Sequence, residues 1–171
     1  MRYVALLRGI NVGGHNKIKM EELREMFSSL QFDDVKSYIA SGNVAFGASE
    51  MKISTLERKI EEAIKTRFGL DIYVMVRSAG ERAAVVRNNP FEKKMSEDTN
   101  LYVVFLKREL SEENAKDLIS HNNEFEEFAV QGRDVFCLSR KGFAKGLVGK
   151  KYIDNKLNTP ETARNWRTVN K

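Results

Sequence analysis

One stretch near the start of the chain carries the residue types best suited to holding an anion. Residues 9–19 combine three glycines, two asparagines and two lysines, between an apolar run and a helix-type pattern. Free backbone N–H groups and the positive end of the helix dipole meet at such a position, and both attract phosphate or carboxylate. The spacing comes close to the nucleotide-binding pattern G-x-x-x-x-G-K-[ST], but His15 replaces the lysine and Asn16 the hydroxyl residue. Without these two groups we do not expect nucleotide hydrolysis.

Polar residues from other parts of the chain are expected to join this loop. In the sheet predicted below, the first strand ends at the same edge as the first hairpin turn, which places Ser41-Gly42-Asn43 beside the loop. Near the C-terminus, Arg164 and Arg167 flank the pair Asn165-Trp166, and such a cluster can wall a site for an anionic or aromatic ligand. A C-terminal helix that docks Trp166 into the core is the simpler interpretation. The predicted ligand-binding residues are Arg8, Asn11, Gly13, Gly14, Lys17, Ser41, Asn43, Arg164 and Asn165.

The sequence favours neither metal nor nucleophilic chemistry. His15 and His121 are the only histidines, and neither has ligand spacing with a cysteine or a carboxylate cluster. The single cysteine, Cys137, lies within a predicted strand, where a small buried residue is the ordinary role. One cysteine excludes an internal disulfide and fits a reducing cytoplasm. We therefore expect no metal and no cofactor, and a cytoplasmic protein.

The composition is that of an ordinary globular protein with a basic C-terminal segment. Of 171 residues, 42% are hydrophobic and 31% charged, and no apolar run suits a signal peptide or a membrane span. Residues 139–171 hold nine basic and two acidic residues, a net charge of +7, which leaves −2 for the rest of a chain at +5. Such a segment attracts nucleic acid, phosphorylated molecules or an acidic partner, although a solvated helix face is the simpler alternative. Residues 141–145 partly match an RNA-recognition strand, but Lys145 stands where an aromatic residue is needed.

Hydrophobic periodicity predicts a βαββαβ unit in the first half of the chain. Its order, with two helices on one face of an antiparallel sheet, is the split pattern of a ferredoxin-like fold. The expected elements are a strand at 3–8, a helix at 20–30, a hairpin at 35–40 and 43–47, a helix from 53 that ends before Gly69, and a strand at 71–76.

The second half repeats this pattern after a predicted helix at 79–88. Its expected elements are a strand at 101–107, a helix at 112–121 after Ser111, a hairpin at 127–131 and 134–139, and a helix over much of 143–157. The first helix and the hairpin turn recur 91 positions later in the chain. We predict an α+β fold, a tandem duplication of ferredoxin-like βαββα(β) units in which the C-terminal segment replaces the last strand. The expected domains are 1–77 and 100–171, joined by a helix and linker at 78–99.

These motifs together resemble an uncharacterised bacterial domain-of-unknown-function family, family 1697. The resemblance extends over essentially the whole chain and implies a tandem α+β duplication, but no established activity. This chain departs from the usual ending of the family, where a threonine commonly precedes Arg-Asn-Trp, since Ala163 stands there. The matching segments are LRGINVGG at 7–14, KIKM at 17–20, YIASGNV at 38–44, NPF at 89–91 and ARNWRTV at 163–169.

Three functions remain open on the sequence alone. The preferred hypothesis is a non-catalytic binding protein for a phosphate-bearing or other anionic ligand, with nucleic acid as one candidate. The alternative is an enzyme that acts on a small anionic metabolite in the same crevice, with the loop as an oxyanion cradle and His15 as proton carrier. The third is an interaction module whose glycine loop only permits a tight chain path. Neither a membrane partner nor a particular oligomeric state is indicated.

Overall fold

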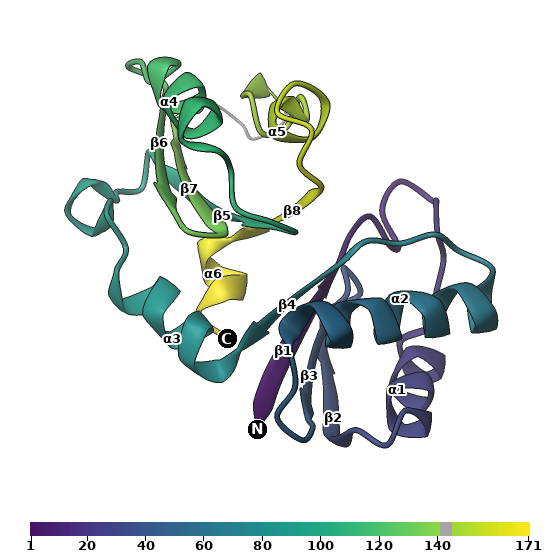
Figure 1. Cartoon of the computed structure of the whole chain (residues 1–171). Helices are drawn as coiled ribbons and strands as arrows, with labels where there is room; N and C mark the ends of the chain where they lie inside the picture. Colours follow the sequence, from purple (N-terminus) through teal and green to yellow (C-terminus); the bar gives the residue numbers. More distant parts are fainter. Residues whose placement is uncertain (141–144) are drawn as a thin grey trace. The chain divides into compact units, whose positions relative to one another are not determined.

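The chain forms two compact units, each built on its own sheet. The computed structural model describes residues 1–140 and 145–171, and the units comprise Met1–Ala83 and Ala84–Lys171. Each unit contains a four-stranded sheet in which every neighbouring pair of strands is antiparallel, and helices pack beside each sheet (Figure 1). The fold is therefore of the mixed α+β class.

In the first unit, the strand order in the sheet is β2-β3-β1-β4. The two long helices agree with the helix-type spacing of the sequence to within a few residues at each end. The elements are β1 (Arg2–Leu7), α1 (Met20–Ser29), β2 (Asp33–Tyr38), β3 (Asn43–Gly47), α2 (Ile53–Phe68) and β4 (Val74–Ser78). Helix α3 (Ala79–Arg87) follows, and the division between the two units falls within it.

Both long helices of this unit cover the same face of the sheet. Alternate residues of the strands point to that face, as the two-residue period of a strand requires. They meet the apolar stripes of α1 and α2 in one continuous core, which explains why Leu7, the last residue of β1, is fully buried. The core includes Tyr3, Ala5, Leu7, Leu23, Met26, Phe27, Val44, Phe46, Leu56, Ile60, Ile64, Val74 and Val76.

The outer edge of β4 is covered by carboxylates. The backbone N–H of Val76 donates to Oε1 of Glu57 at 2.9 Å, and that of Val74 donates to Oε1 of Glu61 at 2.8 Å. The N–H of Ser78 donates to Oε2 of Glu81 at 2.8 Å, while the Ser78 hydroxyl accepts from the N–H of Glu81. The last pair is a capping box, which satisfies donors at the start of α3.

In the second unit, the strand order is β6-β7-β5-β8. Its apolar core joins one face of the sheet to α4 and α5, and it includes Val104, Leu118, Phe128, Val135, Cys137 and Ile153. The elements are η1 (Glu92–Lys94), β5 (Asn100–Leu106), α4 (Glu112–Ser120), β6 (Glu126–Gln131), β7 (Asp134–Ser139), α5 (Tyr152–Asn155), β8 (Glu161–Asn165) and α6 (Trp166–Val169).

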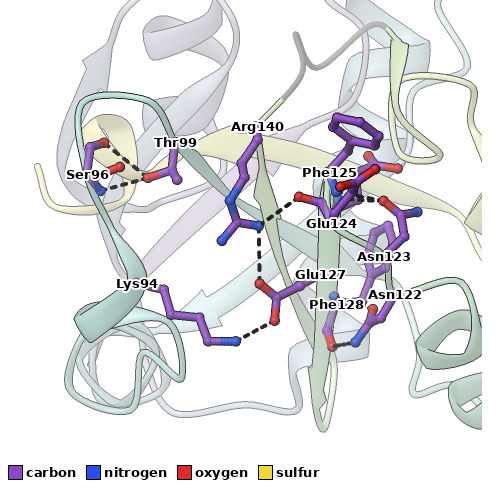
Figure 2. Close-up of polar contacts among 11 residues, drawn as sticks. Lys94, Ser96, Thr99, Asn122, Asn123, Glu124, Phe125, Glu127, Phe128 and Arg140 are labelled. Carbon is purple, nitrogen blue, oxygen red and sulfur yellow. Dashed lines mark hydrogen bonds and ion pairs between the residues drawn. The ribbon is translucent and has the colours of Figure 1, made fainter.

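A carboxylate with two cationic partners ties η1 to the β6–β7 hairpin. Oε1 of Glu127 accepts from Nζ of Lys94 at 2.5 Å, and its Oε2 accepts from Arg140 at 3.3 Å (Figure 2). The hydrogen bond from Lys94 is the largest influence, and it lowers the pKa of the Glu127 carboxyl. Arg140 also donates to the carbonyl of Glu124, so that one guanidinium joins the start of β6 to the end of β7.

Two predictions about the end of the chain are wrong. The expected helix over 143–157 is reduced, in the described residues, to α5 (Tyr152–Asn155), and Lys151 before it has a φ of 57°, which ends regular helix there. Residues 141–144, including most of the partial RNA-recognition match, lie outside the described residues. The last strand of the second unit is not replaced, because Glu161–Asn165 pairs with β5 as strand β8. Helix α6 starts only at Trp166, which is half-buried, and Val169 is its buried residue.

Within the described residues, no helix has both the length and the apolar character needed to cross a bilayer.

Candidate functional site

The glycine loop after β1 is a miniature hairpin. Gly13 and Gly14 both have positive φ angles, 58° and 79°, and the N–H of His15 donates to the carbonyl of Val12 at 3.0 Å. Two consecutive positive φ angles inside such a bond are typical of a type I′ turn, which glycine adopts most readily. The N–H of Asn11 donates to the carbonyl of Asn16 and extends the ladder by one rung. The glycines therefore serve a tight turn here.

The side chain of Asn11 holds this hairpin to two other segments. Its Oδ1 accepts from the N–H of Ile18 at 2.9 Å, and its Nδ2 donates to the carbonyls of Ile18 at 2.9 Å and Ala40 at 2.8 Å. Asn11 has a φ of 55°, a conformation that asparagine tolerates better than most residues. Because both amide hydrogens and the oxygen are used, Asn11 shapes the loop.

The loop lies beside the first hairpin turn, as predicted. The N–H of Leu7 donates to the carbonyl of Gly42 at 2.8 Å, and the Asn11–Ala40 bond joins the same two segments. A Cβ on Gly42 would lie 2.8 Å from Cβ of Leu7 and 2.9 Å from Cγ1 of Ile10, so only glycine fits this contact. We call residues 8–19 together with 38–43 the loop end of the first unit.

Hydrogen-bond donors are exposed at the loop end. In the portion of the chain that the structure describes, the backbone N–H groups of Gly13, Gly14 and Lys17 have no protein acceptor. No side chain caps α1, whose N-cap position is Lys19, so the first turn of that helix also presents N–H groups. The Lys17 side chain is exposed, as is Lys19, which pairs with Glu22 at 3.6 Å.

Two other predicted residues of this unit, Asn43 and Arg8, hold the backbone of the loop end in place. Asn43 is buried, and its Nδ2 donates to the carbonyl of Tyr38 at 3.0 Å and to Oγ of Ser41 at 3.3 Å. The N–H of Arg8 donates to the carbonyl of Tyr73 at 3.0 Å, which fixes the backbone at the end of β1.

Arg164 and Asn165 belong to the second unit, and their polar groups have local partners. Arg164, 8% exposed, donates to Oγ1 of Thr162 at 2.7 Å and to the carbonyl of Ala163 at 2.9 Å. Burial lowers the pKa of its guanidinium to about 10, while Glu161 acts in the opposite direction. Oδ1 of Asn165 accepts from the N–H of Thr168 at 2.9 Å and caps α6.

Sequence reasoning missed Arg77, which occupies the same place in the first unit. Arg77 is 1% exposed and lies opposite Val4, as Arg164 lies opposite Val103, and it donates to the carbonyl of the preceding residue at 3.0 Å. Both arginines are followed by the N-cap residue of a helix, Ser78 or Asn165. An arginine and a capping residue at the end of an apolar strand were the available signal.

A hydrogen-bonded chain of three side chains joins α4 to α5 in the second unit. The Tyr152 hydroxyl donates to Oδ2 of Asp117 at 2.7 Å and lies 3.0 Å from Nε2 of His121. The hydrogen bond to Asp117 is the largest influence, and it raises the pKa of Tyr152. Asp117 and His121 are exposed, while Tyr152 is half-buried and packs against the core, so the three side chains tie the α5 segment to α4. Among the described residues, no three His, Cys, Asp or Glu side chains are grouped to hold a metal ion.

Comparison with known proteins places this geometry in a family. The conserved bacterial protein SP0830 from Streptococcus pneumoniae has a similar solved structure, with a TM-score of 0.79 and 25% sequence identity over 99% of this chain and 94% of that one. No curated protein matches the chain. Residues 1–136 match the family described as Protein of unknown function (DUF1697), and the chain belongs to that family.

Proposed function

We propose that this member of the DUF1697 family binds a phosphate-bearing or other anionic ligand at the loop end of the first unit. Nucleic acid is the candidate that we would test first. One observation carries the proposal: the backbone N–H groups of Gly13, Gly14 and Lys17 lack protein acceptors within the described residues, in a segment that also leads into an uncapped helix. Donors of this kind at a helix start are suited to anions.

The proposal gives different roles to the residues selected from the sequence. Lys17 and the glycine amides are the direct donors, while Asn11 and Asn43 hold the hairpin and the neighbouring turn in place. Ser41 lies in that turn, 3.3 Å from Nδ2 of Asn43. Arg164 and Asn165 stabilise β8 and α6 through their own contacts, so they are not needed as direct ligands.

The basic segment of the second unit supplies a further attraction for a polyanion. Lys145, Lys150, Lys151 and Lys156 are exposed around α5, and the described residues give none of them an acidic partner. Exposed cations of this kind strengthen binding to nucleic acid in a salt-dependent and sequence-independent way.

The test is a binding titration with fluorescently labelled random-sequence oligonucleotides, single-stranded and duplex, across a salt series. We expect the logarithm of the binding constant to fall linearly with the logarithm of the salt concentration, and Lys17→Ala should lower the binding constant. Lys52→Ala is the matched control, because Lys52 is also exposed but precedes α2, at the opposite end of the sheet from the loop. Absence of binding, or equal effects of the two substitutions, would reject this site.

We also propose that the chain is a tandem duplication of ferredoxin-like units. The two sheets share one strand order, and the Val4–Arg77 pair of the first corresponds to the Val103–Arg164 pair of the second. In both units a helix follows the last strand directly, after a capping residue. Superposing the two units in an experimental structure would test this proposal. Residues 74–81 should superpose on residues 161–168 when the two sheets are aligned, and a failure to do so would contradict it.

We further propose a cytoplasmic location, on the ground that the single cysteine, Cys137, is a buried free thiol. Fractionation of cells that express the protein with an epitope tag would test it.

A further inference from the structure

Three large apolar side chains are exposed at the loop end of the first unit. Val12 is 59% exposed, Ile39 49% and Tyr38 38%. Val12 stands at the start of the type I′ turn, and the other two end β2 and begin the next turn. Turns are usually made of small and polar residues, so three apolar side chains here are unexpected.

The backbone at Ile39 deepens this anomaly. Ile39 has a φ of 51°, in the left-handed region that β-branched residues strongly avoid. Asparagine or glycine would occupy this position with less strain. Because the Ile39 side chain is exposed, replacing it with a polar residue would sacrifice little buried apolar surface. Strained residues of this kind cluster at ligand sites, because the surrounding contacts hold them in place for another purpose.

Hydrogen bonds hold the backbone that carries these side chains. Asn43 donates to the carbonyl of Tyr38, and Asn11, which directly precedes Val12, donates to the carbonyl of Ala40, which directly follows Ile39. Both bonds come from side-chain amides that are themselves held by further partners. We name Val12, Tyr38 and Ile39 the apolar ridge. Its backbone is held by these bonds before any ligand arrives, so that binding need not order the backbone, which lowers the entropic cost.

The cations beside the ridge indicate what it accepts. Lys36 precedes Tyr38 by two residues on β2, so both side chains point to the same face of the sheet. Lys36 and Lys17 are exposed, and neither has an acidic partner among the described residues. A ligand complementary to this surface combines a flat apolar group with a negative charge, which is the chemistry of a nucleotide.

We infer that the ligand of the loop end is single-stranded nucleic acid, with a base packed on the apolar ridge and the adjoining phosphates held by Lys17 and Lys36. This inference rests on the proposed function and narrows it. In a duplex the faces of the bases are stacked on one another, so a ridge that packs against a base selects single strands.

The experiment measures fluorescence anisotropy of a labelled oligothymidylate of about twelve nucleotides, a length within the usual range of single-strand binding sites. The comparison ligands are the matching thymidylate–adenylate duplex and inorganic polyphosphate, which carries the charge without the bases. The variants are Tyr38→Ala and Ile39→Asn, with Ile119→Ala as control, because Ile119 is exposed to a similar degree on α4 of the second unit.

We expect Tyr38→Ala to weaken single-strand binding roughly tenfold, within the range known for loss of one contact between a base and an aromatic ring. Ile39→Asn should weaken it to a smaller degree, because isoleucine packs against a base without an aromatic face, and the control should change little. In the ridge variants, the slope of the logarithm of the binding constant against the logarithm of the salt concentration should stay unchanged, because the ridge makes no ion pair with phosphate. Lys17→Ala should lower that slope by roughly 0.7, and only this variant should weaken the binding of polyphosphate. Ile39→Asn should fold at least as stably as the original protein, because asparagine relieves the backbone strain.

Unchanged affinity for the single strand in both ridge variants would overturn the inference. It would also be overturned if the ridge variants lost affinity equally for the single strand and for polyphosphate. Equal affinity of the original protein for the single strand and the duplex would also overturn it. In each of these cases the effect of Lys17→Ala on polyphosphate binding still decides the proposed function separately.

Discussion

Nδ2 of Asn11 donates a hydrogen bond to the carbonyl oxygen of Ala40 at 2.8 Å, across 29 residues of sequence. This bond joins the glycine hairpin to the turn between β2 and β3, and the same side chain holds both backbone groups of Ile18. This one amide side chain therefore links three parts of the loop end.

Replacing Asn11 should destabilise the protein clearly. Asn11→Gly keeps the positive φ accessible but leaves three backbone groups without their partner, and we expect a loss of about 2–4 kcal/mol in the free energy of unfolding. Asn16→Gly is the control, since it also keeps a positive φ but removes one bond, to the carbonyl of Gly9. Urea unfolding followed by circular dichroism gives both values, and equal losses would contradict the role assigned to Asn11.

Two glycines of the loop end, Gly42 and Gly14, should respond differently to alanine. Gly42→Ala forces a Cβ against Leu7 and Ile10 at a φ of 87°, and we expect a loss of about 2–4 kcal/mol. Gly14→Ala meets no atom within 4 Å at a φ of 79°, so only the backbone strain applies, about 1 kcal/mol. Thermal unfolding of the two variants side by side measures the difference, and a similar loss in both would show that the Gly42 contact relaxes freely.

The thiol of Cys137 should be inert in the folded protein. Burial, the largest influence, and the charge of Glu126 raise its pKa from 9 to about 12, and the thiolate is the reactive form. We expect alkylation by iodoacetamide at pH 8 to be roughly a thousandfold slower than that of a free thiol. Mass spectrometry before and after denaturation in urea provides the measurement. Rapid labelling of the folded protein would show that the interior of the second unit opens readily.

The Glu127 pair with Lys94 should contribute to stability at neutral pH and lose its contribution in acid. Since the pKa of this carboxyl is lowered in the folded state, its stabilising effect is present above the ordinary value of 4.5 and disappears as the pH falls through the lowered value. Glu127→Gln should therefore be less stable than the original protein at pH 7, and the difference should shrink as the pH falls below 4.5. The midpoint of urea unfolding at a series of pH values from 7 downward measures this effect, and a difference that stays constant through the series would contradict it.

Local sequence patterns predicted most elements of the fold, because the apolar spacing of a helix and the turn residues of a hairpin both lie within a short stretch of the chain. The spacing of apolar residues located α1 and α2 within a few residues, and Ser111 does cap α4, since its Oγ accepts from the N–H of Asn114. Strand β4 begins three residues later than predicted, at Val74, because Ile72 and Tyr73 are residue types that favour strands but lie before the ladder with β1. The strand β8 escaped prediction because its residues, Glu161–Asn165, have weak strand preference and are held by pairing with β5.

The candidate site was only partly predictable for a related physical reason. Topology placed Ser41 and Asn43 beside the loop, since a strand end and a hairpin turn share an edge of the sheet. The role of Asn11 depends on Ala40, which no local pattern connects to it. The exposure of Tyr38 and Ile39 was hidden as well, because apolar residues before a turn ordinarily complete a buried strand.

The carboxylates of Glu57, Glu61 and Glu81 along β4 also determine how the sheet of the first unit can meet another chain. A neighbouring strand adds to a sheet only through unpaired backbone groups at its edge, and the outward N–H groups of β4 are already occupied. The opposite edge, β2, carries an irregular register between Asp33 and Lys36, which bends it away from a regular template. Each edge of this sheet therefore carries a feature that hinders the addition of a further strand.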